Sequence, residues 1–324
     1  MKHSLRITLL LIGIFFLAQI MGIAILDQYI NIKETFTTGK TVIYEEKYNL
    51  TGITPPPIEN ESTSYLYILA GVLLGTLLVL LIIRFKKKNL WKFWFFVSVV
   101  ICLVVAWTPF IQKLLLKLSI SEEFTVILTT IIASILAIYK IFKQNILIHN
   151  FTELFIYGGL AAILVPRINL FSVTILLIAI SLYDMYAVWK SKHMVTMATF
   201  QSDAKMFAGV LIPYNTQALH AQTTSRTETT KTKEAQLQAP QKQKTADVSI
   251  HAAVLGGGDI AFPLLFSGVI MKTTGSYLNP IIISVVVTVA LFILLLAGKR
   301  GKFYPAMPFL AIGCLGGYGI ISLL

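Results

Sequence analysis

Long apolar runs constrain this chain more than any other feature of its sequence. A helix rising about 1.5 Å per residue needs about 20 apolar residues to cross the ~30 Å hydrocarbon core of a bilayer. Because 56% of the 324 residues are hydrophobic and only 13% are charged, the chain has more apolar surface than a soluble domain can bury. The sequence therefore predicts an all-α, multi-pass membrane protein with nine transmembrane helices, at residues 7–26, 65–83, 93–111, 124–142, 147–165, 170–189, 252–271, 280–297 and 303–324.

The positively charged residues predict how these helices are oriented, since Lys and Arg are retained on the cytoplasmic side of a membrane. With the N-terminus in the cytoplasm, 20 of the 27 Lys and Arg residues fall on that side, many of them at 84–92 and 190–244. These cations border apolar runs, so contact with anionic lipid head groups explains the net charge of +12 better than nucleic-acid binding does. We therefore expect a cytoplasmic N-terminus and an extracytoplasmic C-terminus.

A polar stretch divides the chain into two groups of helices. Residues 222–249 are rich in Gln, Thr, Lys and Ala and contain almost no large apolar residue, a composition typical of a flexible linker. We expect a six-helix N-terminal part at 1–190, a cytoplasmic loop at 191–250 and a three-helix C-terminal part at 251–324.

Three acidic residues fall inside the apolar runs, where an ionisable group is costly and therefore a functional hypothesis: Glu153, Asp184 and Asp259. Asp184 and Asp259 lie on helices that run in opposite directions, and each is expected about 9 to 12 Å below the cytoplasmic surface. Neighbouring antiparallel helices can bring two carboxyl groups together at that depth. Glu153 lies near the end of its helix, where a structural or interfacial role is expected.

Two carboxyl groups that share a site suit peptide-bond hydrolysis. Mutual repulsion and desolvation leave one group protonated and the other ionised near neutral pH. The ionised group takes a proton from water as the water attacks the scissile carbonyl, and the protonated group stabilises the oxyanion and then protonates the leaving nitrogen. This chemistry calls for no metal and no cofactor, and the sequence leaves open which aspartate plays which part.

Three glycines, Gly256, Gly257 and Gly258, immediately precede Asp259. Each destabilises a helix by about 1 kcal/mol relative to Ala, so something must compensate. Bare backbone can let an unwound substrate segment approach closely, or it can let helices pack closely together. The glycines alone favour neither explanation.

Three short motifs together resemble the presenilin and signal peptide peptidase family of intramembrane aspartyl proteases. The segment 255–259 resembles the Gly-x-Gly-Asp motif of that family, Tyr183-Asp184 resembles its Tyr-Asp motif, and Pro305-Ala306-Met307 resembles its Pro-Ala-Leu motif. The motifs fall in the expected helices, the sixth, seventh and ninth of nine. Met307 stands where the family has Leu, a volume-conserving change. The resemblance is greatest to the microbial, archaeal homologues.

The resemblance implies that Asp184 and Asp259 are the catalytic pair. It also implies that Pro305, Ala306 and Met307 border the active site. Tyr183 could donate a hydrogen bond to substrate or to a carboxylate, or simply pack. The candidate substrate-binding residues are therefore Tyr183, Gly256, Gly257, Gly258, Pro305, Ala306 and Met307. The implied partners are transmembrane helical protein substrates and the lipid bilayer, with a homo-oligomer and accessory subunits left open.

The main alternative is a proton- or cation-coupled transporter or channel, because paired intramembrane carboxylates also relay ions. The absence of a repeat between the two halves and the combination of three motifs weigh against it. Type IV prepilin peptidases also use Gly-x-Gly-Asp, but they carry a lysine where this chain has Ala261. An inactive scaffold stays open.

Overall fold

The computed structural model describes residues 5–56, 60–85, 87–118, 121–143, 145–191, 207–213, 252–298 and 304–323. The described chain is mostly helical. Its elements, in chain order, are α1 (Leu5–Leu26), α2 (Ile32–Thr38), α3 (Glu45–Thr51), η1 (Glu61–Thr63), α4 (Ser64–Arg84), α5 (Lys88–Leu116), α6 (Glu122–Ile141), α7 (Ile146–Leu164), η2 (Val165–Arg167), α8 (Leu170–Tyr186), η3 (Ala187–Ser191), β1 (Gly209–Pro213), β2 (Ala252–Gly256), α11 (Gly257–Thr274), α12 (Leu278–Ala297) and α13 (Met307–Leu323).

Seven helices in the described part of the chain are long and apolar enough to cross a membrane: α1, α4, α5, α6, α7, α8 and α12. The other two predicted spans correspond to α11, whose first turn carries an acid and whose last turn carries a lysine, and to α13, an apolar helix of 17 residues. The nine-helix topology and the orientation of the termini stay predictions. The predicted linker at 222–249 lies outside the described residues.

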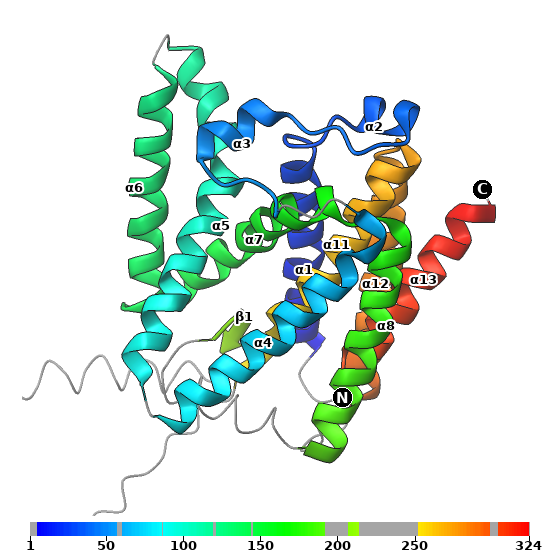
Figure 1. The fold of residues 1–324 in the computed structure, drawn as a ribbon. Helices are drawn as coiled ribbons and strands as arrows, with labels where there is room; N and C mark the ends of the chain where they lie inside the picture. Colours follow the sequence, from blue (N-terminus) through cyan, green and yellow to red (C-terminus); the bar gives the residue numbers. More distant parts are fainter. Residues whose placement is uncertain are drawn as a thin grey trace, which may run out of the picture.

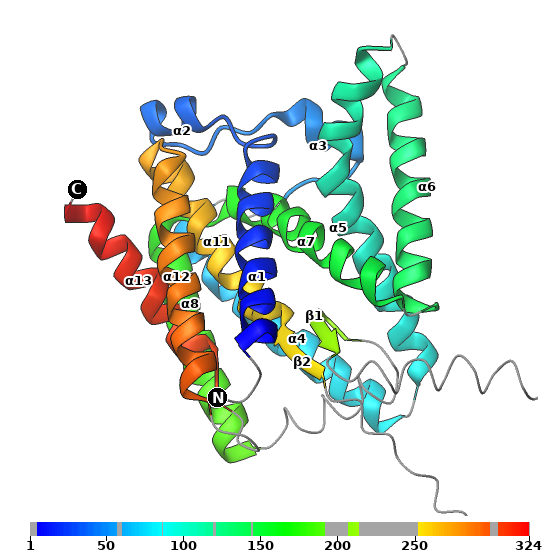
Figure 2. The same cartoon turned by 180° about the vertical axis from the view of Figure 1, so that it is seen from behind.

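The helices form three groups side by side (Figures 1 and 2). The α5–α6 pair lies on one side, α8, α12 and α13 lie on the other, and α1, α7 and α11 lie between them. Most of α11 is buried, and its side chains pack with those of α1, α7 and α12 in one continuous apolar core. Exposed leucines along α4 show that this helix lies at the periphery. The buried part of α11 begins at Ile260, directly after Asp259.

The expectation of an all-helical chain is wrong at one place. Residues 252–256, predicted as the first turns of a helix, form strand β2, which pairs antiparallel with β1. Gly209 lies opposite Gly256 and Pro213 lies opposite Ala252, so β1 lies antiparallel beside the segment that enters α11. Because the strand ends where α11 begins, Asp259 lies in the first turn of its helix and not two turns inside it.

Two buried tyrosines fasten the segment between α1 and α4 to the helices. The hydroxyl of Tyr29 donates to the Val105 carbonyl of α5 at 2.7 Å, and that of Tyr48 donates to the Ala162 carbonyl of α7 at 2.6 Å. Burial raises the pKa of both phenols above its ordinary value, so both remain protonated donors. These two hydrogen bonds hold the segment between α1 and α4 against the helices.

Candidate functional site

Asp184 lies in the last turn of α8 and caps the start of α13. The backbone N–H of Met307 donates to its Oδ2 at 3.2 Å, and the N–H of Ala306 also bonds to this carboxylate. The first N–H groups of a helix have no partner within the helix and are usually satisfied by the side chain of the residue that precedes it. That residue is Ala306, which has no such side chain. The carboxylate of Asp184 replaces it and also complements the positive end of the helix dipole.

Asp259 lies at the third position of α11 and reaches back to the residue that precedes the helix. Gly256 is that residue, with φ −65° and ψ 146°, and its backbone N–H bonds to the Asp259 carboxylate. An acidic side chain at this position stabilises a helix start by accepting that N–H. Asp259 is therefore held at the junction where β2 becomes α11. Pro263, one turn later, has no N–H to donate to the Asp259 carbonyl.

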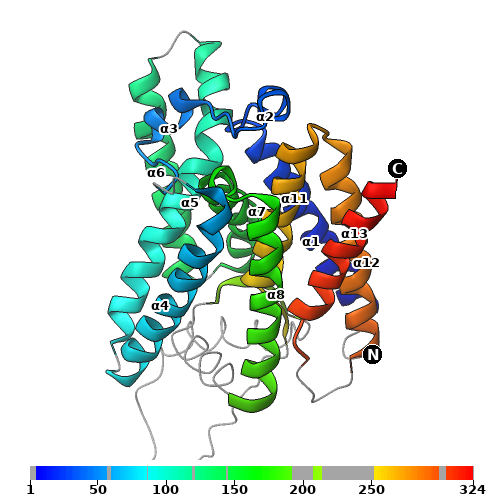
Figure 3. The ribbon, with the colours of Figure 1, turned by 45° about the vertical axis from the view of Figure 1, so that its right-hand side comes forward.

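The two predicted aspartates come together at one level of the bundle. α8 packs against both α11 and α13, and Figure 3 shows α8 running beside α11 with the start of α13 next to it. The carboxyl groups of Asp184 and Asp259 are close enough to interact electrostatically. Within the described residues, no three His, Cys, Asp or Glu side chains are grouped so as to hold a metal ion. The site therefore has two neighbouring carboxyl groups, of which Asp184 accepts from two backbone N–H groups and Asp259 from one.

The three glycines of the motif differ in their surroundings. A Cβ placed on Gly256 would lie 3.1 Å from Asp259 Oδ2, and one on Gly257 would lie 2.8 Å from the hydroxyl of Tyr157. A Cβ on Gly258 would make only an ordinary contact of 3.6 Å with Phe262, and Gly258 is exposed. Close packing thus explains Gly257. Gly256 leaves room for the carboxylate, and Gly258 leaves an open stretch of backbone beside it.

The remaining motif residues lie around the same junction. Pro305 and Met307 are buried at the start of α13, and Ala306 and Tyr183 are partly buried. Met307 and Ala306 contact Asp184 through their backbone N–H groups. Tyr183 directly precedes Asp184 on α8. A role of Tyr183 in binding substrate stays a prediction.

Sequence reasoning missed two polar residues that touch this region. Tyr157 of α7 lies against Gly257, and Gln19 of α1 donates its side-chain amide to the Ile260 carbonyl at 2.9 Å. Glu153, expected to be structural or interfacial, is buried and paired with Lys140. His149, Glu153 and Tyr157 recur every fourth residue, which puts them on one face of α7. That spacing was a signal available in the sequence.

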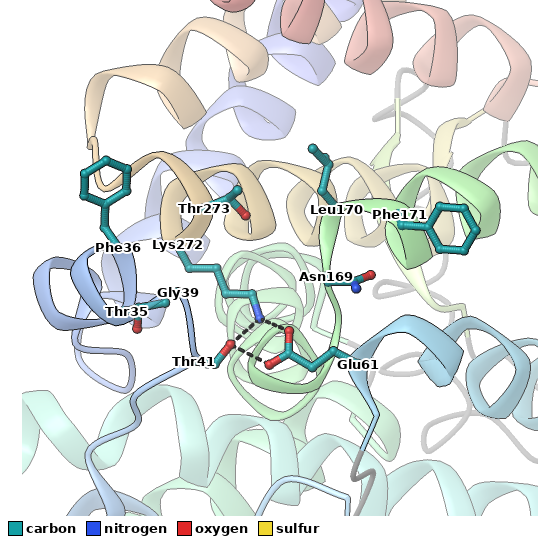
Figure 4. A pocket seen from close by; sticks show the side chains of 10 residues that line it. All are labelled: Thr35, Phe36, Gly39, Thr41, Glu61, Asn169, Leu170, Phe171, Lys272 and Thr273. Carbon is teal, nitrogen blue, oxygen red and sulfur yellow. Dashed lines mark hydrogen bonds and ion pairs between the residues drawn. The ribbon is translucent and has the colours of Figure 1, made fainter.

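A pocket of about 280 Å³ lies at the other end of α11 and does not reach the aspartates. There Lys272 donates to Glu61 at 3.0 Å and to Thr41 at 2.7 Å, as Figure 4 shows. Thirteen helical residues separate Lys272 from Asp259, which corresponds to about 20 Å. The Lys272–Glu61–Thr41 cluster ties the loop between α1 and α4 to the end of α11 and is not part of the candidate site.

Comparisons with known proteins agree with this picture. Residues 49–324 match the family model described as signal-peptide peptidase, presenilin aspartyl protease. Two solved structures, both described as a presenilin family intramembrane aspartate protease, in C222 and P2 crystal forms, are each 16% identical to the chain. They cover 97% and 99% of this chain, which in turn covers 99% and 98% of theirs, with TM-scores of 0.55 and 0.58. The likeness shows a shared fold. A search of curated proteins gave no match.

Proposed function

Because the chain belongs to the signal-peptide peptidase, presenilin aspartyl protease family, we propose that Asp184 and Asp259 are the catalytic pair with which it cuts transmembrane segments of other proteins. The protein is a multi-pass membrane protein and an aspartyl protease. The meeting of the two carboxyl groups at the junction of α8, α11 and α13 carries this proposal. Among the described residues, these are the two acids that lie within the family motifs.

The two carboxyl groups hydrolyse a peptide bond while holding one proton between them. The ionised carboxylate takes a proton from water while the water oxygen bonds to the scissile carbonyl carbon. The protonated carboxyl group donates a hydrogen bond to the developing oxyanion, then gives its proton to the nitrogen as the C–N bond breaks. The pair ends with one proton, as it began. The backbone N–H groups of Met307 and Gly256 each occupy one side of a carboxylate and so orient it, leaving the rest of each group for water or substrate.

The substrate segment is proposed to bind as an extended strand along the outer edge of β2. The edge of β1 that faces α7 is already occupied, because the Asn150 side chain accepts from the Leu211 N–H at 3.0 Å and donates to the Leu211 carbonyl at 2.9 Å. Val254 lies opposite Leu211, so its own N–H and C=O point away from β1. Within the described residues β1 is the only partner of β2. An added strand at this edge would run directly towards Asp259.

Val254→Pro is expected to lower kcat/KM by at least about tenfold, because it removes the N–H that would pair with substrate. The control is Val254→Ala, which shortens an exposed side chain and keeps the backbone donor, and it should cleave nearly as well as the unchanged protein. Initial rates on a transmembrane helical substrate in liposomes measure both. Equal activity of the two variants would contradict strand addition at this edge.

Met307→Pro tests the cap on Asp184. Met307 is the first residue of α13, the helical position that best tolerates proline, so the substitution removes the N–H while keeping the helix start. A hydrogen bond to a carboxylate is worth about 1.5 to 3 kcal/mol, and we expect kcat to fall about tenfold. Met307→Leu restores the residue common in the family and should keep activity within about threefold. If both variants cleave alike, the cap does not orient Asp184.

The assay that decides the function uses purified protein alone in liposomes with a single-span helical substrate, and the products are identified by mass spectrometry. Cleavage within the hydrophobic segment, blocked by a hydroxyl-bearing transition-state mimic, is the expected result. Proton or cation flux without cleavage would favour the transporter instead. The same experiment shows whether the chain acts without partner subunits.

A further inference from the structure

Four polar side chains form a buried cluster between α6 and α7, next to the candidate site and outside the family motifs. They are Lys140 of α6 and His149, Glu153 and Tyr157 of α7. Lys140, Glu153 and Tyr157 are each no more than 5% exposed. Taking charged groups into the interior of a membrane protein is costly, so such groups are usually functional.

The cluster is connected by hydrogen bonds through Glu153. One of its carboxylate oxygens accepts from the Lys140 ammonium group, and the other accepts from the hydroxyl of Tyr157. Lys140 also approaches His149 Nδ1 at 3.3 Å, while His149 Nε2 lies 2.8 Å from the Gly209 carbonyl. Since Nε2 must donate to a carbonyl, Nδ1 is the acceptor for Lys140 and the ring is the neutral Nε2–H tautomer.

Both ends of the cluster contact the residues around the junction of β2 and α11, which carries Asp259. His149 holds Gly209, which lies directly opposite Gly256 in the strand pair, and the N–H of Gly257 bonds to the Ala208 carbonyl at 3.0 Å. Tyr157 lies against Gly257 and interacts electrostatically with Asp259. The two contacts therefore brace the same junction from the β1 side and from the α7 side.

Stability alone does not account for the cluster. A buried ion pair can often be replaced by apolar residues of similar size without loss of stability, because desolvation offsets the attraction between the charges. What an apolar replacement does not supply is a fixed hydrogen-bonded placement of Tyr157 and His149. We infer that Lys140, Glu153, Tyr157 and His149 are positioning residues that hold the β2–α11 junction so that Asp259 faces Asp184. The inference rests on the proposed function.

Tyr157→Phe removes the hydroxyl alone and is expected to lower kcat about tenfold, because a small misplacement of a reacting group is costly. KM should rise by no more than about threefold, because β2 keeps its pairing with β1. Affinity for the transition-state mimic should fall by the same factor. Tyr29→Phe is the matched control, because it also removes a buried hydroxyl that donates a hydrogen bond, in this case to the Val105 carbonyl of α5 and far from the junction. If Tyr157→Phe and Tyr29→Phe keep equal kcat, the inference is overturned.

A second set of variants separates positioning from stability. Glu153→Leu alone leaves Lys140 buried without its partner and should lower the Tm by about 5 °C or more. Adding Lys140→Met removes the unpaired charge and should return the Tm close to that of the unchanged protein. We expect kcat in the double variant to stay about tenfold low. A kcat that recovers together with the Tm would show that the cluster serves stability only.

Amide hydrogen exchange gives a readout that does not depend on cleavage. In Tyr157→Phe, exchange at 207–213 and 252–260 should become at least about tenfold faster, with no change there in Tyr29→Phe. If the unchanged protein cleaves nothing but exchange responds in this way, the proposed function fails while the brace on the junction stands. Unchanged exchange in Tyr157→Phe would overturn the brace whether or not the protein cleaves.

Discussion

Asp184→Asn and Asp259→Asn are each expected to lower the cleavage rate about a thousandfold or more while leaving the fold intact. Asn has nearly the same shape as Asp, and its amide oxygen can still accept the N–H of Met307 or of Gly256. The caps on α13 and α11 are therefore kept, and only the ability to exchange a proton is lost. Because the two groups act as one unit, the double variant should be no slower than either single variant. Product formation by mass spectrometry and the Tm of each variant measure the two effects.

Glu123→Gln provides the control, because this exposed acid lies in the first turn of α6, away from the junction. It should cleave at the rate of the unchanged protein. If either Asn variant kept more than about a tenth of the activity at an unchanged Tm, the aspartates would not be the acid and base of the reaction. Losses that multiplied in the double variant would mean that the two residues act independently.

The helices were predictable because each needs only a long apolar run, a property that is local in the sequence. The strand at Ala252–Gly256 was not predictable from the same reasoning. Its residues are small and apolar, and such a short segment fits a strand as well as a helix start. Pairing with Gly209–Pro213 decides between the two, and that partner lies across a long polar loop. A contact between distant segments has no local signal.

The candidate site was predictable in its residues and only partly in its geometry. Asp184 and Asp259 were expected to lie near each other, and their carboxyl groups interact in the structure. Asp259 lies at a helix start and not within a helix, and the depth of the pair in the membrane stays a prediction. The capping of α13 by Asp184 was not visible, because it joins a side chain of one helix to the backbone of another. Tyr157 was not predicted as a polar contact, because a tyrosine in an apolar run usually packs as a hydrophobic residue. Its four-residue spacing from Glu153, and that of Glu153 from His149, puts all three side chains on one face of α7.

Gly256→Ala is expected to lower kcat about tenfold without destabilising the protein. At φ −65° and ψ 146° the backbone accepts Ala without strain, and replacing Gly by Ala at such a position tends to stabilise. The new Cβ would lie 3.1 Å from Asp259 Oδ2, which is closer than ordinary contact, so the carboxylate must move. The contact is relieved when the carboxylate moves by a few tenths of an ångström. A misplacement of about 1 Å can cost a reaction about a hundredfold, so this smaller shift is expected to cost about tenfold. KM should change little.

Gly258→Ala is the comparison within the same motif, and it separates the two explanations for the glycines. Its Cβ would make only an ordinary contact of 3.6 Å with Phe262, so kcat and the Tm should hold. Because Gly258 is exposed beside the carboxylate, the added methyl group is expected to raise KM if an unwound substrate passes over this backbone. Kinetics with the substrate at several concentrations in liposomes resolve kcat from KM for both variants. A normal kcat in Gly256→Ala would show that the Asp259 carboxylate can move without losing its function. The close approach of Asp259 to Gly256 would then not be required for catalysis.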